Sequence, residues 1–209
     1  MLADKPTAAP ATAPATTPAT TSSSRRLRRL TPDRLTGDQR ALYATIADGP
    51  RASGHQFFAL AADDGSLNGP FEALLLSPAI GTAVQELGAA VRYQSGLPNR
   101  LREMAILLVA AHWGSAFELM AHTALGRAAG LRDDDVDALL DRRTPPSADA
   151  LEYAACAAVR ALLTAGDLDD GAYADVVEHL GEQAVFELTT LVGYYGLLAL
   201  QLRVFRVDG

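Results

Sequence analysis

The sequence has very little cysteine: Cys156 is the only one in 209 residues. One cysteine cannot form a disulfide framework within the chain, and thiol–disulfide catalysis needs both an attacking thiolate and a resolving thiol. Intramolecular disulfide bonds and a two-cysteine redox site are therefore excluded. The lack of a disulfide framework suits a reducing cytoplasm, which is where we expect the protein.

Long hydrophobic runs are also missing. The longest uncharged run, Leu188 to Leu202, has fifteen residues, whereas a membrane-spanning helix needs about 20. The sequence contains no Gly-rich phosphate loop, no His-Glu-x-x-His and no Cys/His spacing typical of zinc sites. We therefore expect no membrane span, no metal and no organic cofactor.

Basic residues are outnumbered, since 18 Lys and Arg stand against 25 Asp and Glu and give a formal net charge of −7. Residues 1–30 hold an excess of positive charge, mainly in Arg25–Arg29, so the remainder of the chain carries about −11. An acidic body is a poor binder of nucleic acid. We expect no nucleic-acid partner.

The first 24 residues differ in composition from the rest of the chain. They are almost wholly Ala, Thr, Pro and Ser, and such a segment buries too little apolar surface to offset chain entropy. We predict a disordered tail over residues 1–24 and one domain over residues 25–209. An apolar fraction of 49% is sufficient for a substantial core in that domain.

Apolar residues recur at helical spacing from Thr36 onward, which predicts an all-α, single-domain antiparallel helical bundle. Caps, glycines and prolines separate the helices. The predicted helices cover 36–48, 70–76, 78–95, a segment opened by Pro98, 115–130, a segment starting at the aspartates 133–135, 148–165, 169–180 and 182–205. The helix from Pro78 is expected to bury Ile80, Val84, Leu87 and Val91.

Proton-transfer groups gather between Glu103 and His122. Glu118 and His122 are four residues apart, so on a helix their Cβ atoms lie about 6 Å apart on one face. A straight helix from Glu103 to His122 would separate them by roughly 28 Å. Gly114 weakens a helix, and Ser115 with Glu118 forms the Ser-x-x-Glu pattern of a capping box. We therefore expect two helices, with Glu103 on the first.

A purely structural role remains open for each of these residues. Glu118 can be a capping carboxylate, His122 a core histidine bonded to a carbonyl, and Glu103 a solvated helix residue. However, Ile106–Val109 make the first helix apolar almost all round, which is typical of a buried helix. Its one acid must then find a partner or shift its pKa. The combination favours an active site.

Five segments in a fixed order carry a likeness to a known family. They are Gly69–Gly81, Leu101–Leu107, His112–Gly114, Glu118 with His122, and Leu191–Tyr195. Together they resemble the carboxymuconolactone decarboxylase family of the alkylhydroperoxidase-D-like superfamily, over most of the chain after about residue 25. The resemblance implies a homo-oligomer, either a trimer or a hexamer, and chemistry without metal or organic cofactor.

The same resemblance separates two chemistries. The peroxidase branch of the superfamily has a Cys-x-x-Cys pair four and seven residues before the histidine, and a glutamate nineteen before it. Here the cysteine positions hold Glu118 and Ser115, whereas Glu103 and His122 match the pattern. Peroxide reduction is therefore disfavoured, and acid–base chemistry is favoured.

We expect a small-molecule substrate and a cofactor-independent lyase or isomerase acting on a carboxylated or lactone-like ring. His122 would be the acid–base group, Glu118 its orienting residue or proton relay, and Glu103 the residue that polarises the pair. The candidates for the pocket wall are Phe71, His112, Trp113 and Tyr194.

Two alternatives stay open beside the lyase. Seventeen arginines to one lysine indicate a high-GC bacterium, where the protein can equally be a tailoring enzyme for a natural product. A non-catalytic ligand-binding protein on the same fold is the other alternative. Leu119 and Arg203 replace a tryptophan and an asparagine that are usual in the family, so the substrate stays undetermined.

Overall fold

The computed structural model of the chain describes residues 25–53 and 57–207. Within these residues there are nine α-helices and two short 3₁₀ helices, and the only β pairing is an isolated bridge between Ala61 and Leu67. The predicted all-α class is confirmed. The tail predicted over residues 1–24 lies outside the described residues. The elements are η1 (Pro32–Arg34), α1 (Gly37–Ala47), η2 (Pro50–Ala52), α2 (Pro70–Leu74), α3 (Pro78–Tyr93), α4 (Asn99–Trp113), α5 (Ala116–Ala128), α6 (Asp133–Leu140), α7 (Ala150–Ala165), α8 (Asp170–Leu180) and α9 (Glu182–Phe205).

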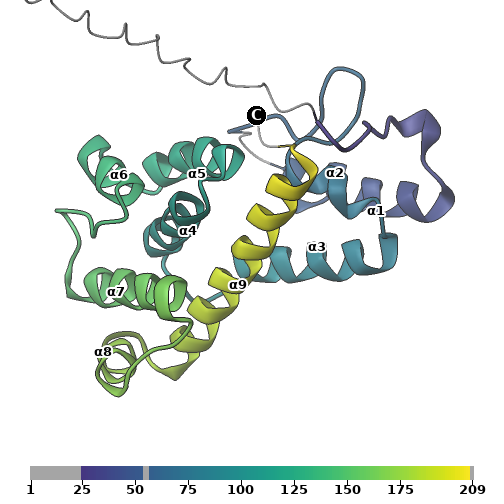
Figure 1. Cartoon of the computed structure of the whole chain (residues 1–209). Coiled ribbons are helices and arrows are strands. Elements are labelled where there is room, and N and C mark those ends of the chain that lie inside the picture. Colours follow the sequence, from purple (N-terminus) through teal and green to yellow (C-terminus); the bar gives the residue numbers. More distant parts are fainter. Residues whose placement is uncertain (1–24, 54–56, 208–209) are drawn as a thin grey trace, which may run out of the picture.

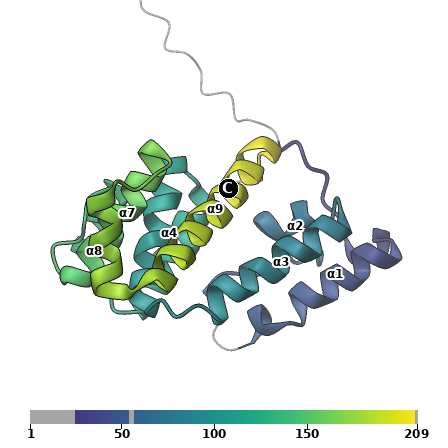
Figure 2. The same cartoon turned by 90° about the horizontal axis from the view of Figure 1, so that it is seen from below.

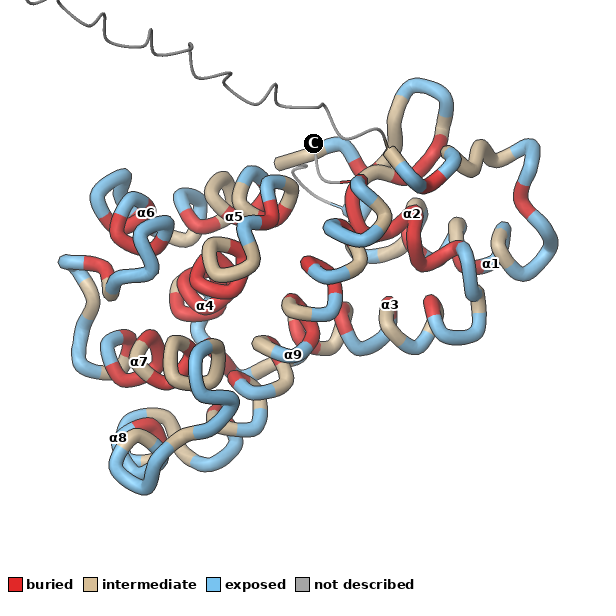
Figure 3. The backbone as a smooth tube through the Cα atoms, viewed as in Figure 1, coloured by how far each residue is buried: buried red, intermediate tan, exposed pale blue. Residues whose placement is uncertain are grey.

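Helix α9 runs diagonally through the molecule, with α4 to α8 on one side and α1 to α3 on the other (Figures 1 and 2). Helix α4 is the core of the larger group, because it packs against α5, α6, α7 and α9. Every residue from Leu101 to Ala110 is buried (Figure 3). The burial expected from its uniformly apolar sequence is confirmed, and Glu103 is carried into the core with it.

The buried face of α3 differs from the prediction. Val91 is buried and Val84 partly so, but Ile80 and Leu87 are 65% and 42% exposed. The face turned inward is Gly81, Gln85, Gly88 and Val91. A Cβ at Gly81 would collide with the carbonyl of Leu74, and one at Gly88 with the hydroxyl of Tyr194. The two glycines face inward because α3 approaches Leu74 and Tyr194 too closely for a side chain at these positions.

The break between α4 and α5 lies at the predicted place. Gly114 has φ 64° and ψ 37° and ends α4 in the left-handed conformation, and Ser115 is the N-cap of α5. The predicted capping box is wrong, because the Ser115 side chain makes no cap hydrogen bond. The carboxylate of Glu118 is instead directed at His122. Thr36, in contrast, forms a full capping box with Gln39 at the start of α1.

Over the described residues, α9 alone is long and apolar enough to cross a membrane. The same length and composition occur in core helices of soluble proteins, and 39% of the apolar stretch is buried within this fold. The sequence prediction rested on a fifteen-residue uncharged run that is too short for a span. Much of the remaining surface of α9 is apolar and exposed, including Phe186, Leu197, Leu200 and Val204.

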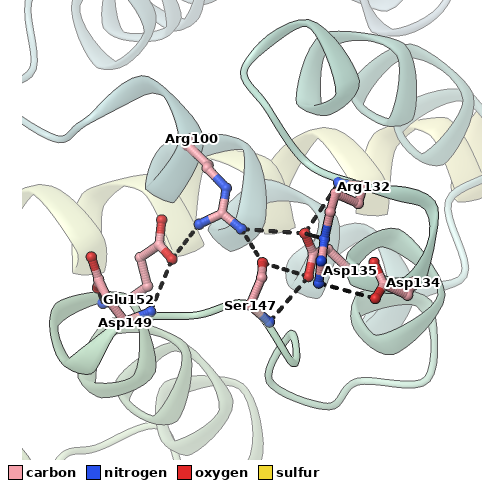
Figure 4. A network of polar contacts seen from close by, with 7 residues as sticks. All are labelled: Arg100, Arg132, Asp134, Asp135, Ser147, Asp149 and Glu152. Carbon is pink, nitrogen blue, oxygen red and sulfur yellow. Dashed lines mark hydrogen bonds and ion pairs between the residues drawn. The ribbon is translucent and has the colours of Figure 1, made fainter.

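A polar network fixes α6 and α7 against α4 (Figure 4). Arg100 of α4 forms ion pairs with Glu152 of α7 and, at 3.3 Å, with Asp135 of α6. The Ser147 hydroxyl donates a 2.6 Å hydrogen bond to Asp135, and the backbone N–H of Arg132 donates another at 3.1 Å. Asp135 is fully buried, and these bonds satisfy its carboxylate. Its role is structural, as expected for an acid at a helix start.

The network predicts how stability depends on pH. Burial raises the pKa of Asp135, but hydrogen bonds from Ser147 and Arg132 outweigh that effect and lower the pKa from 3.8 to about 2. A depressed folded-state pKa stabilises the fold above the unfolded value, and the contribution disappears as pH falls toward the folded value. In urea unfolding, Asp135→Asn should lose about 1–3 kcal/mol at neutral pH. It should also show a weaker loss of stability between pH 4 and pH 2 than the wild type.

The matched control is Asp137→Asn, on the exposed side of the same helix. This change should leave the free energy of unfolding nearly unchanged. Equal effects of the two substitutions would contradict the assigned role of Asp135.

Candidate active site

Packing of α4 against α5 brings Glu103 and His122 together across nineteen residues of sequence. The Oε2 atom of Glu103 lies 2.6 Å from Nδ1 of His122, and both side chains are buried. A solvated position for Glu103 is thereby contradicted. The buried acid of α4, Glu103, is therefore hydrogen-bonded to an ionisable side chain.

Glu118 binds the other side of the same imidazole. One turn of α5 separates the two residues, and Oε2 of Glu118 lies 3.2 Å from Nε2 of His122. Each ring nitrogen of His122 therefore faces a carboxylate, not a backbone carbonyl. A neutral imidazole has one N–H donor and an imidazolium has two, so two acceptors favour the charged form.

The electrostatics of the cluster follow from these contacts. Burial alone lowers the pKa of His122, but the hydrogen bonds and charges of Glu103 and Glu118 outweigh it and raise the pKa above the ordinary value. Burial raises the pKa of Glu103, yet His122, Arg92 and Arg102 lower it overall. Nη1 of Arg92 lies 3.6 Å from Oε1 of Glu103. The structure thus favours an imidazolium between two carboxylates.

Two tyrosines of α9 enclose the imidazole. Tyr195 meets His122 edge-to-face, with 5.2 Å between ring centroids and 90° between planes, and Tyr194 packs on Tyr195 in the same way. Burial raises the pKa of both phenols. The tyrosines therefore stay neutral near pH 7 and restrict the orientation of the histidine ring.

The cluster opens into a cavity of about 320 Å³, which is within the usual range for a small ligand. The cavity lies where η2, α2 and the end of α3 face α5 and α9. Its walls are mostly aromatic and aliphatic, with charged groups at a few points. The lining residues are Pro50, Arg51, Ser53, Phe57, Phe58, Pro70, Phe71, Arg92, Tyr93, Phe117, Glu118, Ala121, His122, Leu125, Tyr194, Tyr195 and Leu198.

Two of the four residues predicted for the pocket wall line this cavity, namely Phe71 and Tyr194. His112 and Trp113 do not. His112 lines a separate hollow between α4 and α7, and Trp113 packs near Gly196 of α9, with Nε1 3.4 Å from an ideal Cβ position there. Both lie at the far end of α4, about 14 Å along the helix from Glu103. Their place next to Gly114 in sequence was misleading.

Other lining residues were missed by sequence reasoning. Arg92 lies near Glu103 because the short turn after α3 folds back into α4. Phe117 is adjacent to Glu118, and its ring covers Gly69, where any side chain would collide with it. The residue beside a candidate acid was a usable signal for Phe117. No comparable signal marked Arg51 or Phe58, which lie between α1 and α2, where the sequence has no helical periodicity.

The cysteine lies away from this cavity. Cys156 is buried in α7, and burial raises the pKa of its thiol to about 12. Such a thiol stays protonated at neutral pH and is a poor nucleophile. Among the described residues, no cluster of three or more His, Cys, Asp or Glu side chains is arranged to hold a metal ion.

The middle of the chain matches a family model. Residues 78–161, which include all three residues of the cluster, match the model of the Carboxymuconolactone decarboxylase family. No curated protein matches the chain.

Several solved structures share the fold. The alkylhydroperoxidase AhpD core of an uncharacterized peroxidase-related protein from Ralstonia eutropha has a TM-score of 0.69 at 14% identity, over 88% of this chain and 90% of that one. A complex of the debrominase Bmp8, as a cysteine-to-alanine variant, with 2,3,4-tribromopyrrole has a TM-score of 0.64 at 15% identity, over 87% and 88%. A protein of unknown function from Agrobacterium tumefaciens, described in relation to the antioxidant defence protein AhpD, has 0.57 at 22%, over 63% and 90%. At these identities the likeness shows a common fold.

Replacing Glu103 tests the electrostatics of the cluster. Glu103→Gln removes the carboxylate at Nδ1 of His122, so the pKa of His122 should fall, as measured by NMR titration of labelled histidine. The raised pKa of folded His122 stabilises the protein below the unfolded value of 6.5, and this contribution is lost as pH rises through the folded pKa. The variant should show a smaller loss of stability over that rise in pH.

Glu178→Gln, on the exposed side of α8, is the control and should leave the His122 titration unchanged. If the pKa of His122 were unchanged in Glu103→Gln, the charge of Glu103 would not stabilise the imidazolium of His122.

Proposed function

Since the chain belongs to the carboxymuconolactone decarboxylase family, we propose that it is a cofactor-independent lyase or isomerase acting on a small carboxylated or lactone-like ring. The observation that carries the proposal is the buried imidazole of His122 between Glu103 and Glu118, at 2.6 and 3.2 Å, facing the cavity. This arrangement can hold a proton and deliver it to a bound molecule.

Decarboxylation of an unsaturated lactone acid balances without a further reagent. The bond between the ring carbon and the carboxylate breaks, and carbon dioxide leaves. The electron pair of that bond passes through the ring double bond to the lactone carbonyl, which acts as the electron sink. One proton is then delivered to carbon. An isomerisation uses the same groups, because a proton is removed from one carbon and returned to another.

His122, Glu118 and Glu103 have separate roles in this proton transfer. Both nitrogens of His122 are bonded to carboxylates, so Glu118, which lines the cavity, is the group that passes the proton between His122 and the substrate. Glu103 favours the imidazolium and holds the ring in place. His122 afterwards takes up a proton from solvent. The aromatic walls exclude water, which disfavours a localised carboxylate relative to the delocalised charge formed as carbon dioxide leaves.

A tailoring role in natural-product biosynthesis is the second candidate. The observation that favours it is the debrominase complex with 2,3,4-tribromopyrrole, a small planar ring bound by a similar fold. In this chain the only cysteine is buried in α7 and does not line the cavity. A tailoring reaction here would therefore depend on acid–base chemistry. The same location disfavours thiol-based peroxide reduction.

Substitutions at the cluster separate catalysis from simple binding. Against a panel of lactones and unsaturated acids, screened by release of carbon dioxide, His122→Ala and Glu118→Gln should lower turnover about 100-fold or more. Equilibrium binding of the same compound should be largely kept, because the cavity walls are intact.

His112→Asn is the matched control, because His112 lies outside the cavity, and it should turn over substrate like the wild type. Wild-type turnover in His122→Ala would exclude the proposed mechanism. Binding without turnover by the wild type across the panel would favour a ligand-binding protein.

A homo-oligomer is also proposed, in line with the family. Residues on the outer side of α9 follow spacings of four and three: the half-buried Thr190 and the exposed Phe186, Gly193, Leu197, Leu200 and Val204. This is the period of a helix–helix seam. An ideal Cβ at Gly193 has no atom within 4 Å, so a second helix can approach there. The seam fits the same seam of a second copy, because it is apolar and uncharged.

Charges placed on the seam should break the assembly. Phe186→Asp with Leu197→Asp should shift the molar mass in sedimentation velocity toward that of a monomer, because burying two carboxylates is costly. Tyr153→Asp, at an exposed aromatic residue of α7, should not change the mass. A monomeric wild type at micromolar concentration would refute the oligomer.

A further inference from the structure

Two guanidinium groups line the cavity and have no part in the proton transfer. Arg51 comes from η2, and Arg92 comes from the last turn of α3. Both therefore belong to the N-terminal group of helices, which comprises α1 to α3 with η1 and η2. Glu118 and His122 belong to α5. The N-terminal group thus contributes the arginines that line the cavity, and α5 contributes the glutamate and the histidine.

Arg51 is held in a defined orientation. Its Nε donates a 3.0 Å hydrogen bond to Oε1 of the buried Gln85, and its guanidinium carbon lies 5.1 Å from the centroid of the Phe71 ring. Nη2 also lies near the Tyr194 hydroxyl. An ideal Cβ at Gly88 would be 2.8 Å from Nη2 and 2.0 Å from that hydroxyl. A guanidinium fixed in this way can bind a carboxylate without losing further side-chain freedom.

The charges around the cavity do not balance. Among the described residues that line it, Arg51, Arg92 and His122 are basic, and Glu118 is the carboxylate. Glu103, behind the imidazole, pairs with Arg92 and His122 and supplies a second negative charge. With His122 as an imidazolium, the positive groups outnumber the two carboxylates, and Arg102 adds a further positive charge near Glu103. An excess of positive charge in a mostly apolar cavity is costly, so a bound anion is favoured.

The remaining walls indicate the shape of that anion. Phe57, Phe58, Phe71 and Phe117 contribute flat apolar surface, and Phe58 and Phe117 meet edge-to-face at 5.4 Å. Flat aromatic walls fit a planar ring better than a flexible chain. A planar ring that bears a carboxylate matches both the positive charge and the walls.

We propose that Arg51 is the specificity-determining residue of the cavity and binds a carboxylate of a planar ring that the reaction leaves in place, orienting that ring toward Glu118. Arg92 contributes positive charge but shares it with Glu103. This assignment rests on the proposed function and narrows its substrate class to planar rings with a carboxylate that is retained in the product. Removal of Arg51 should weaken anion binding without disturbing the proton-transfer cluster.

The test compares benzoate with benzamide, a neutral molecule of the same shape, by isothermal titration calorimetry at pH 7. The wild type should bind benzoate more tightly than benzamide. Arg51→Gln should weaken benzoate binding about tenfold or more, because a charge-assisted contact is lost. It should change benzamide binding little. Arg51→Lys should fall between, since lysine keeps the charge but not the planar guanidinium that bonds to Gln85 and lies over Phe71.

Arg127→Gln, on the exposed end of α5, is the control and should bind benzoate like the wild type. Circular dichroism checks the fold of each variant, and the wild-type preference for benzoate tests the proposal even if Arg51→Gln is unstable. Equal binding of the two probes, binding of neither, or unchanged benzoate binding by a folded Arg51→Gln overturns it.

The outcome is independent of the lyase proposal, because binding at equilibrium needs no turnover. Benzoate binding through Arg51 in a protein without turnover would overturn the lyase alone. Turnover without any effect of Arg51 on benzoate binding would overturn the anion site alone.

Discussion

The contact between Glu103 and His122 is the interaction on which the site depends. A carboxylate placed in the most buried helix of the fold would be costly on its own, because burial penalises its charged form. His122 of α5 and Arg92 of α3 compensate that charge at 2.6 and 3.6 Å. Three helices must therefore be correctly packed before the charge is balanced. The acid–base cluster is in this sense a product of the tertiary structure, and fold and site are energetically coupled.

The cavity combines contributions from two groups of helices. Helix α5 carries Glu118 and His122, and α9 supports their geometry through Tyr194 and Tyr195. The N-terminal group supplies the arginines and Phe71. Residues 78–161, which match the family model, include the cluster but not Arg51 or Phe71. The three residues of the cluster thus lie in the part of the chain that matches the family model, and much of the cavity wall lies outside it.

Sequence reasoning was strongest where one physical requirement left few solutions. The apolar helix around Glu103 required a partner for its acid, and Gly114 allowed the chain to turn back and provide one. It failed where two patterns competed. On α3, small and large residues both recur at helical spacing, and only the distance to neighbouring elements decides that Gly81 and Gly88 face inward. Ser115 and Glu118 fit a capping box, but the bond to His122 competes for the same carboxylate. Arg51 lies in η2, which has three residues and is too short for periodicity to show which way a side chain points.

Gly114 connects the two helices that carry the cluster, and it has φ 64° with no atom within 4 Å of an ideal Cβ position. The site there has room for a side chain, and only the left-handed backbone disfavours one, at about 1–2 kcal/mol. If another residue replaced Gly114, relief of its backbone strain would rotate α5 about its junction with α4. The distance from Glu103 to His122 would then change. The proton affinity of the imidazole is therefore linked to a single backbone torsion, which gives mutation a way to adjust reactivity without replacing any group that touches a substrate.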